Sequence, residues 1–294
     1  MVAEADPVHP AAIDDWEPWI RLGAFLGVFA AMAAWEVLAP RRERLHPRRV
    51  RWSANLGLVV LDSLAVRLAF PVAAVGFAVL AAERGWGVLN AIGLPPAIAF
   101  VIAVAALDLA IYFQHVMFHA VPLLWRLHRV HHADPDFDVT TGVRFHPVEI
   151  LLSMGIKFAA IALIGAPAAA VFAFEVILNA CAMFNHGNVR LPERIDRALR
   201  RVVVTPDMHR IHHSMEKAEA NSNYGFNLAW WDRLFGTYRA QASLPQERMR
   251  IGVEGITGSG PEVSLSGMLA MPLRGAAAPS REPDPRLDGA GEPT

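Results

Sequence analysis

Long apolar runs dominate the chain and predict membrane-spanning helices. The first covers residues 20–39, the second roughly 54–82 and the third roughly 94–118. Each is long enough for a helix to cross a bilayer, which takes about 20 residues. A fourth run, 148–184, is too long for one span and is broken by IGAP at 164–167. We read it as a hairpin of two short helices that either crosses the bilayer or enters and returns.

The composition agrees with membrane insertion and limits the possible chemistry. Hydrophobic residues make up 54% of the chain, and the mean hydropathy is +0.30. The net charge of −1 gives no basic field for nucleic acid. Cys181 is the single cysteine, so thiolate metal sites and disulfides within the chain are excluded, and a metal must be held by nitrogen or oxygen. The acidic start, without Lys or Arg, does not predict a signal peptide.

Charge in the loops predicts the orientation. The loop PRRERLHPRRVR at 40–51 holds six arginines and one acid, Glu43. By the positive-inside rule this loop is cytoplasmic and the N-terminus is outside. Counting crossings from there places every histidine from His115 to His213 on the cytoplasmic face, whether or not the hairpin crosses. The fold predicted is an all-α, polytopic integral membrane helical bundle with a cytoplasmic, histidine-rich cap.

The same pattern divides the chain into four segments. Residues 1–19 form an N-terminal arm, and 20–93 hold the N-terminal transmembrane helices. Residues 94–240 carry ten of the 12 histidines, and we expect any catalytic domain to lie there. The C-terminal tail, 241–294, is rich in Gly, Pro, Ser and Ala, and we expect disorder from about residue 276.

The third apolar run ends in a polar stripe. His115 and His119 are four residues apart, so they share one face of a helix, and Asp108 and Tyr112 lie on the same face. One interpretation makes the two histidines metal ligands and Asp108 a buried acid that orients a ligand or a neighbouring group. The alternative is a polar contact between helices.

The motif H-x-x-H-H occurs twice, and a helical turn would gather each triplet on one side. The triplets are His128, His131 and His132, and His209, His212 and His213. Two copies plus H-x-x-x-H make a solvated surface cluster a poor explanation. Eight imidazoles exceed what one ion can use, and they suit two ions with open positions. A structural zinc site would be closed by four ligands, so the surplus favours catalysis.

Four histidines lie outside these motifs. His186 follows the hairpin at the cytoplasmic face, and we interpret it as a ligand. His146, in RFHPVE, is either a ligand or a support for one. His9 and His46 stand apart in the sequence and are expected to be solvated surface residues.

The order of these motifs resembles the fatty acid hydroxylase / sterol desaturase superfamily. The flanking sequences RFHPVE, NHGN and NYGFNLAWWDRLFGTY are also similar to that family, and the resemblance covers about residues 50–240. It implies an integral membrane enzyme that uses O₂ and two iron ions to hydroxylate or desaturate a C–H bond of a lipid, fatty acyl, sterol or related. The implied ligands are His115, His119, His128, His131, His132, His186, His209, His212 and His213. Asp108, His146, Asn223 and Tyr224 are candidates to support the ligands, and no catalytic residue is expected beyond these.

Two departures from the family qualify this expectation. The sequence shows no fused cytochrome b5-like domain, so electrons are expected from a separate protein, of ferredoxin or cytochrome b5 type with a reductase. His186 stands alone where some relatives carry more histidines, so the ligand count of one iron is open.

Other classes of histidine-rich protein fit less well. Membrane zinc proteases use H-E-x-x-H, and no histidine here is followed by Glu. A haem protein needs only one or two axial histidines, whereas the motifs here hold eight. A metal transporter would place its ligands near the bilayer midplane. A zinc hydrolase or a metal transporter is therefore kept only as the alternative to an oxygenase.

Overall fold

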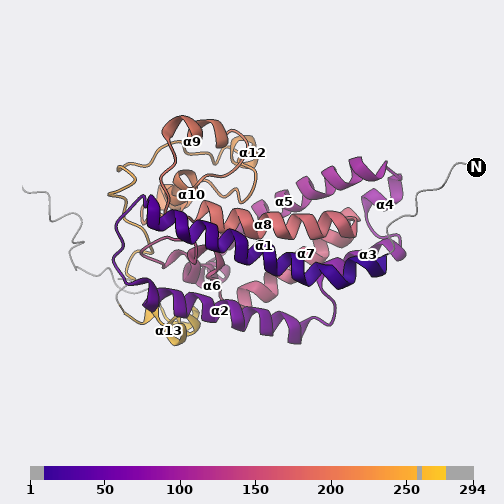
Figure 1. The fold of residues 1–294 in the computed structure, drawn as a ribbon, viewed down its shortest axis with the longest axis horizontal. Coiled ribbons are helices and arrows are strands. Elements are labelled where there is room, and N and C mark those ends of the chain that lie inside the picture. The colour runs from indigo at the N-terminus through magenta and orange to yellow at the C-terminus, as the bar shows by residue number, and fades with distance from the viewer. Residues whose placement is uncertain (1–9, 257–259, 276–294) are drawn as a thin grey trace, which may run out of the picture.

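The computed structural model describes residues 10–256 and 260–275, and in that part the secondary structure consists of helices and a few isolated β-bridges (Figure 1). The predicted disorder beyond residue 276 and the surface position of His9 concern residues outside it. The α-helices are α1 Pro10–Leu38, α2 Arg48–Ala69, α3 Ala74–Glu83, α4 Val88–Ile92, α5 Pro96–Ala120, α6 Pro122–His132, α7 Pro147–Ile164, α8 Ala168–Asn185, α9 Glu193–Leu199, α10 Pro206–His212, α11 Lys217–Ala220, α12 Trp230–Leu234 and α13 Leu265–Ala270. Short 3₁₀ turns lie at Thr141–Val143, Pro261–Val263 and Met271–Leu273.

Five stretches are long and apolar enough to cross a membrane. They are Trp16–Leu38, Arg48–Ile92, Pro96–Ala120, Pro147–Ile164 and Ala168–Asn185. The prediction of an all-α, polytopic membrane bundle is therefore confirmed. Its apolar core, which includes Ala78, Leu107, Ile161 and Phe174, lies between α3, α5, α7 and α8.

The hairpin predicted in the fourth apolar run is present as α7 and α8. Gly165 ends α7 in the left-handed conformation, with φ of 73°, which glycine adopts without a steric penalty. Pro167 lies two residues later, directly before α8. Proline has no backbone N–H, so α7 cannot continue through it, but a new helix can begin after it.

The first two apolar runs differ from the prediction. α1 begins at Pro10, so the second half of the predicted arm is helical. The run 54–82 is not one helix but α2 and α3, separated at residues 70–73. Pro71 explains the break, since it forces Phe70 into an extended conformation and ends α2 there.

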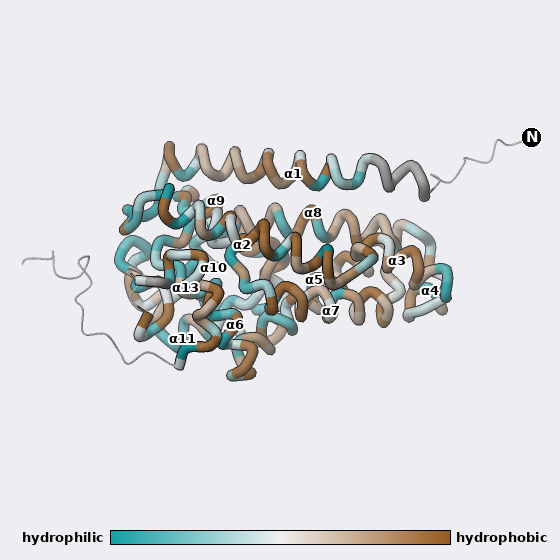
Figure 2. Tube along the Cα trace, turned by 90° about the horizontal axis from the view of Figure 1, so that it is seen from below, coloured by the Kyte–Doolittle hydropathy of each residue, from teal (hydrophilic) through white to brown (hydrophobic). Residues whose placement is uncertain are grey.

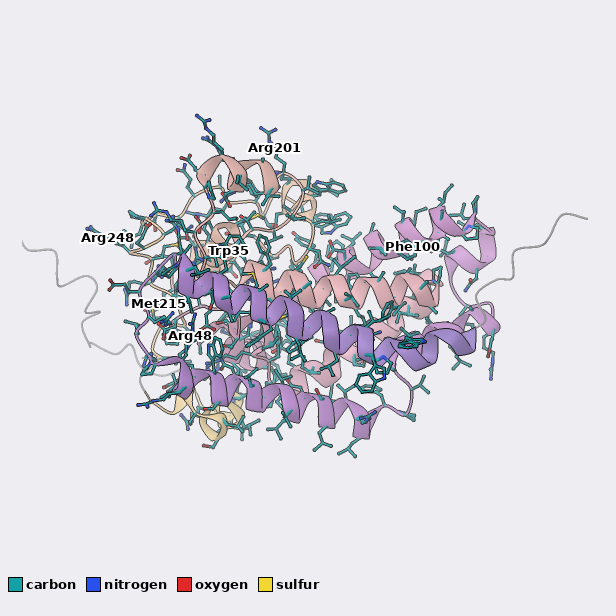
Figure 3. The ribbon with its side chains drawn as sticks, viewed as in Figure 1. Trp35, Arg48, Phe100, Arg201, Met215 and Arg248 are labelled. Carbon is teal, nitrogen blue, oxygen red and sulfur yellow. The ribbon has the colours of Figure 1, made fainter. Side chains whose placement is uncertain are left out.

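The longer loops and the short helices between them gather at one end of the bundle and form the cap. It consists of residues 39–47, 121–146, 186–256 and 260–275, on the left of Figure 1. Hydrophilic positions concentrate at this end (Figure 2). Figure 3 places Arg48, Arg201 and Arg248 there and Phe100 toward the other end. The arginine loop and the histidines thus share one side, as the crossing count predicted. Whether that side is cytoplasmic remains a prediction.

Helix α1 stands apart from the rest of the bundle in Figure 2 and packs against α8. Near the cap, Glu36 accepts backbone N–H groups of Val139 and Asn188 at 2.7 and 3.0 Å. Toward the other end, Arg21 pairs with Glu175 of α8 at 2.8 Å. The helix is therefore bound firmly at the cap and by an ion pair further out.

Candidate metal centre

Four segments deliver the predicted ligands to one place beneath the cap. His115 and His119 lie in the last turns of α5, and α6 carries the first triplet. The extended Val121 joins the two helices, and Pro122 starts α6 with a φ suited to a first helical residue. His186 directly follows α8. The second triplet belongs to α10, with His213 as its last, capping residue.

The nine histidines form two groups. In each group, one ligand atom per residue lies within 4.8 Å of all the others. The first group is His115, His119, His128, His132 and His212, and the second is His131, His186, His209 and His213. The structure thus brings together every residue that was predicted as a ligand.

The split explains why the chain repeats H-x-x-H-H. In α6, His128 and His132 join the five-histidine group, while His131 joins the four-histidine group. In α10 the partition is reversed, because His209 and His213 share the four-histidine group and His212 does not. Residues four apart share a helix face, and the third points to the neighbouring site. Each motif therefore contributes to both groups.

The ring nitrogens face one another in a way that calls for a cation. His115 Nδ1 donates to the Tyr224 carbonyl and His212 Nδ1 to the Ser222 carbonyl, each at 2.8 Å. A neutral imidazole has one N–H, so both Nε2 atoms carry lone pairs. These two Nε2 atoms lie 3.0 Å apart. Two nitrogens bound to one ion at about 2.1 Å lie at about this separation, so a metal resolves the repulsion.

The four-histidine group repeats this arrangement around His186. Its Nδ1 donates to the Ala182 carbonyl at 2.7 Å, which leaves Nε2 as a lone pair. That Nε2 faces the Nε2 atoms of His131, His209 and His213 at 3.0, 3.0 and 3.2 Å. One lone pair cannot satisfy three neighbours by hydrogen bonding. A shared cation can.

Burial keeps these rings neutral, which is the form that binds metal. Desolvation lowers the pKa of His128 and of His186 to about 3. Burial, followed by repulsion from neighbouring histidines, holds the pKa of His131 and His213 well below the ordinary value. The rings are therefore lone-pair donors at neutral pH, and the residues present fit a metal.

A buried carboxylate that the sequence analysis did not propose supports one ligand. Glu149, in the first turn of α7, lies 2.7 Å from His128 Nδ1. This contact leaves His128 Nε2 for a metal and orients the ring. The available signal was an acid at the start of an apolar run, in the motif RFHPVE that also contains His146.

The other supporting candidates act on the cap. Asp108 accepts the backbone N–H of Leu228 at 3.1 Å and the indole N–H of Trp231 at 2.8 Å, so it orients a neighbouring segment. Asn223, with φ of 52°, donates to the Met208 carbonyl at 3.0 Å. Tyr224 contributes its carbonyl to His115, as described above.

His146 belongs to neither histidine group. Its Nδ1 accepts the backbone N–H of Val148 at 3.2 Å and caps α7, and its Nε2 lies 3.2 Å from the Leu269 carbonyl. His46 is not the solvated residue that was expected. It is half-buried, and its ring lies 3.2 Å from the Asp136 carboxylate, because the loop 39–47 folds onto the cap.

The cap role of His146 leads to a specific expectation. His146→Ala removes the side chain that satisfies the first turn of α7, which typically costs about 1 kcal/mol. We expect a lower melting temperature with an unchanged metal content, measured by thermal unfolding and by elemental analysis of the purified variant. Loss of metal would instead identify His146 as a ligand.

A buried ionic network fixes the loop after α6. Arg51 of α2 binds Asp134 through two nitrogens, at 2.7 and 2.6 Å, and Asp138 at 2.7 Å. Arg51, Asp134 and Asp138 are fully buried. Burial would raise the pKa of Asp134, but the charges of Arg51 and Arg144 hold it well below its usual range. The ion pairs of this network therefore fix the loop that follows His132 to α2.

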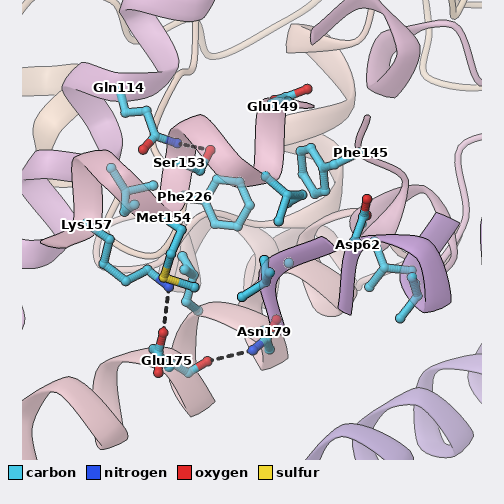
Figure 4. A pocket seen from close by; sticks show the side chains of 18 of the residues that line it. Asp62, Gln114, Phe145, Glu149, Ser153, Met154, Lys157, Glu175, Asn179 and Phe226 are labelled. Atoms are coloured by element: carbon cyan, nitrogen blue, oxygen red, sulfur yellow. Dashed lines mark hydrogen bonds and ion pairs between the residues drawn. The ribbon is translucent and has the colours of Figure 1, made fainter. Parts of the chain in front are cut away.

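A cavity of about 390 Å³ reaches the five-histidine group. Most of its wall comes from α2, α5, α7 and α8 (Figure 4). Phe25 of α1, His115 of α5 and His128 of α6 also line it. Ile111, Phe118 and Leu178 make much of it apolar. A cavity of this size suits a small organic group or part of a longer chain.

Known proteins resemble this chain in its histidine-bearing part. Residues 100–237 match the fatty acid hydroxylase family. The chain is 31% identical over 144 residues to ornithine lipid hydroxylase OlsE of Rhizobium tropici, covering 49% of this chain and 43% of that protein. It is 29% identical over 147 residues to alkylglycerol monooxygenase of Homo sapiens, covering 47% and 30%.

The chain therefore spans less than half the length of these relatives. No solved structure matches it. The matched residues lie inside the segment 94–240, while the remaining predicted boundaries stay predictions. Over residues 100–237 the resemblance indicated by the histidine motifs is confirmed, because this segment matches the fatty acid hydroxylase family.

Proposed function

We propose that this chain is a membrane-bound, non-haem di-iron oxidoreductase that uses O₂ and external electrons to hydroxylate or desaturate a C–H bond of a lipid. The observation that carries the proposal is the pair of facing Nε2 lone pairs of His115 and His212, 3.0 Å apart, in a group that borders a cavity between apolar helices. The two relatives named above support it, since their names describe oxidation of lipids.

The proposed ligands are the nine histidines in their two groups. Iron is chosen because of the family, and imidazole nitrogens suit it. When bound, the two irons would supply the redox chemistry that reduces O₂ and oxidises the C–H bond. Hydroxylation consumes two electrons and two protons and releases one water besides the alcohol.

The protein's own residues hold and shield the site. Glu149 and the carbonyls of Ala182, Ser222 and Tyr224 orient ligand rings through their second nitrogens. Apolar side chains such as Phe118 exclude water from the cavity. The surrounding apolar helices allow a lipid to enter from the bilayer. We place the site on the cytoplasmic face and the N-terminus outside, and expect a separate ferredoxin-type or cytochrome b5-type donor with its reductase.

The proposal is tested with ¹⁸O₂. The purified protein is loaded with iron under anaerobic conditions, mixed with a lipid extract and a reductant, and exposed to ¹⁸O₂. We expect one lipid class to gain an ¹⁸O-labelled hydroxyl, or to lose two hydrogens if the reaction is desaturation, as read by mass spectrometry. Retention of zinc alone after iron loading, with no O₂-dependent product, would exclude the oxygenase and favour a hydrolase or transporter.

A further inference from the structure

The wall of the cavity has a polar region next to the five-histidine group. Glu149 contacts His128 directly, and Asp62 of α2 and Gln114 of α5 line the same cavity. In Figure 4, Asp62, Phe145 and Glu149 lie at one end, and Lys157 and Glu175 lie toward the other. The end that holds Glu149, which contacts the candidate ligand His128, therefore also holds the Asp62 carboxyl, while Gln114 lies beside Ser153 further along the wall.

Three buried oxygens in this wall have no hydrogen-bond donor in the described part of the protein. They are Asp62 Oδ1, Gln114 Oε1 and Glu149 Oε2. Asp62 and Glu149 are more than nine-tenths buried. Burying an unpaired polar atom is costly, so a set of three around one cavity indicates a place where a ligand supplies the donors.

The described wall of the cavity offers an anionic ligand no free positively charged side chain. Lys157 is the single Lys or Arg among the described residues that line it, and its Nζ lies 2.6 Å from Glu175 Oε1. The other oxygen of Glu175 pairs with Arg21 at 2.8 Å. A phosphate or carboxylate would find no free cation, and a bare hydrocarbon would leave the three acceptors unpaired.

We propose that the cavity binds the polar head of a lipid whose head group donates O–H or N–H hydrogen bonds and carries no anion. Asp62, Gln114 and Glu149 accept these bonds, and the chain lies against Ile111, Met154 and Leu178. The inference rests on the proposed function, because it takes the cavity as the substrate site. It places the reacting carbon within a few bonds of the head group, next to His115 and His128.

Binding to the full-length protein without reductant tests the inference, since no turnover is possible. Four probes share one C16 chain: 1-O-hexadecylglycerol, hexadecylamine, hexadecyl methyl ether and hexadecanoate. Native mass spectrometry in detergent gives their dissociation constants. We expect the diol, the amine or both to bind about tenfold more tightly than the ether, as one additional buried hydrogen bond allows. A preference for the diol identifies hydroxyl heads, and one for the amine identifies ammonium heads.

Variants assign the effect to the wall. Asp62→Leu should bring the favoured probe to within about threefold of the ether, because it removes the acceptor. Ser63→Ala is the matched control, since the Ser63 hydroxyl already donates to the Val59 carbonyl at 2.7 Å. Asp62→Asn retains an acceptor oxygen, so it should keep diol binding while losing any preference for the amine. Metal content and melting temperature show whether each variant is folded.

Equal binding of all four probes, tightest binding of hexadecanoate, or an unchanged ranking in Asp62→Leu would overturn the inference. These results are independent of oxygenation. If the ranking holds but no lipid is oxidised, the proposed function fails and the head-group site stands. If a lipid is oxidised far along its chain, the function stands and the head-group site fails.

Discussion

His131→Ala and His212→Ala are each expected to lose about one of two irons and to keep the other. His131 belongs to the four-histidine group and His212 to the five-histidine group, so each change removes a ligand from one site only. Hydroxylation should be abolished in both variants if both irons are needed. Iron per chain, measured by elemental analysis after identical anaerobic loading, checks the first part of the prediction.

His146→Ala is the matched control for these variants. It removes an imidazole from the same end of the bundle, but from a ring that caps α7 and belongs to neither group. It should keep both irons. Full iron retention in His131→Ala or His212→Ala would contradict the ligand assignment, and loss of both irons in each would contradict two separate sites.

Arg51→Met is expected to destabilise the protein by about 3–5 kcal/mol, because it leaves buried carboxylates without their partner. Asp134 and Asp138 both bind the Arg51 guanidinium at 2.6–2.7 Å and are fully buried. The loop that they hold follows His132, so metal content should fall along with stability. The free energy of unfolding in detergent, from denaturant titration, gives the magnitude.

Arg49→Met is the control, because it removes a positive charge from the same helix and leaves the buried Arg51 network intact. Arg49 lies two residues earlier in α2 and is exposed. Removing it should change the stability by less than about 0.5 kcal/mol, as is usual for surface positions. Equal destabilisation by the two variants would show that the buried network contributes no more than a surface charge.

Features governed by local periodicity could be predicted from the sequence. The apolar runs and the break before Pro167 gave the hairpin. The spacing of the histidines gave eight of the nine members of the two groups, and His186 came from its place after the hairpin and from the family resemblance. Pro71 was also visible, but the apolar run around it outweighed it, so α2 and α3 were read as one helix. Local pattern thus located the site and most of its scaffold.

Features that depend on the tertiary fold could not be predicted in this way. The contact between Glu149 and His128 joins residues 21 positions apart on different helices. His46 meets Asp136 across 90 positions, and nothing near either residue indicates the other. The division of each triplet between two groups likewise follows from how α6 and α10 face each other. Such pairings exist only once the helices have packed.

The attachment of α1, which differs between its two ends, has a mechanical consequence. Its cap end is fixed by Glu36, while its outer half rests on α8 through apolar side chains and the pair between Arg21 and Glu175. In a bilayer, lipid tails replace apolar helix contacts at little cost. α1 can therefore act as a hinged cover over the cavity that its own Phe25 helps to line. A product could leave sideways past this cover without entering water.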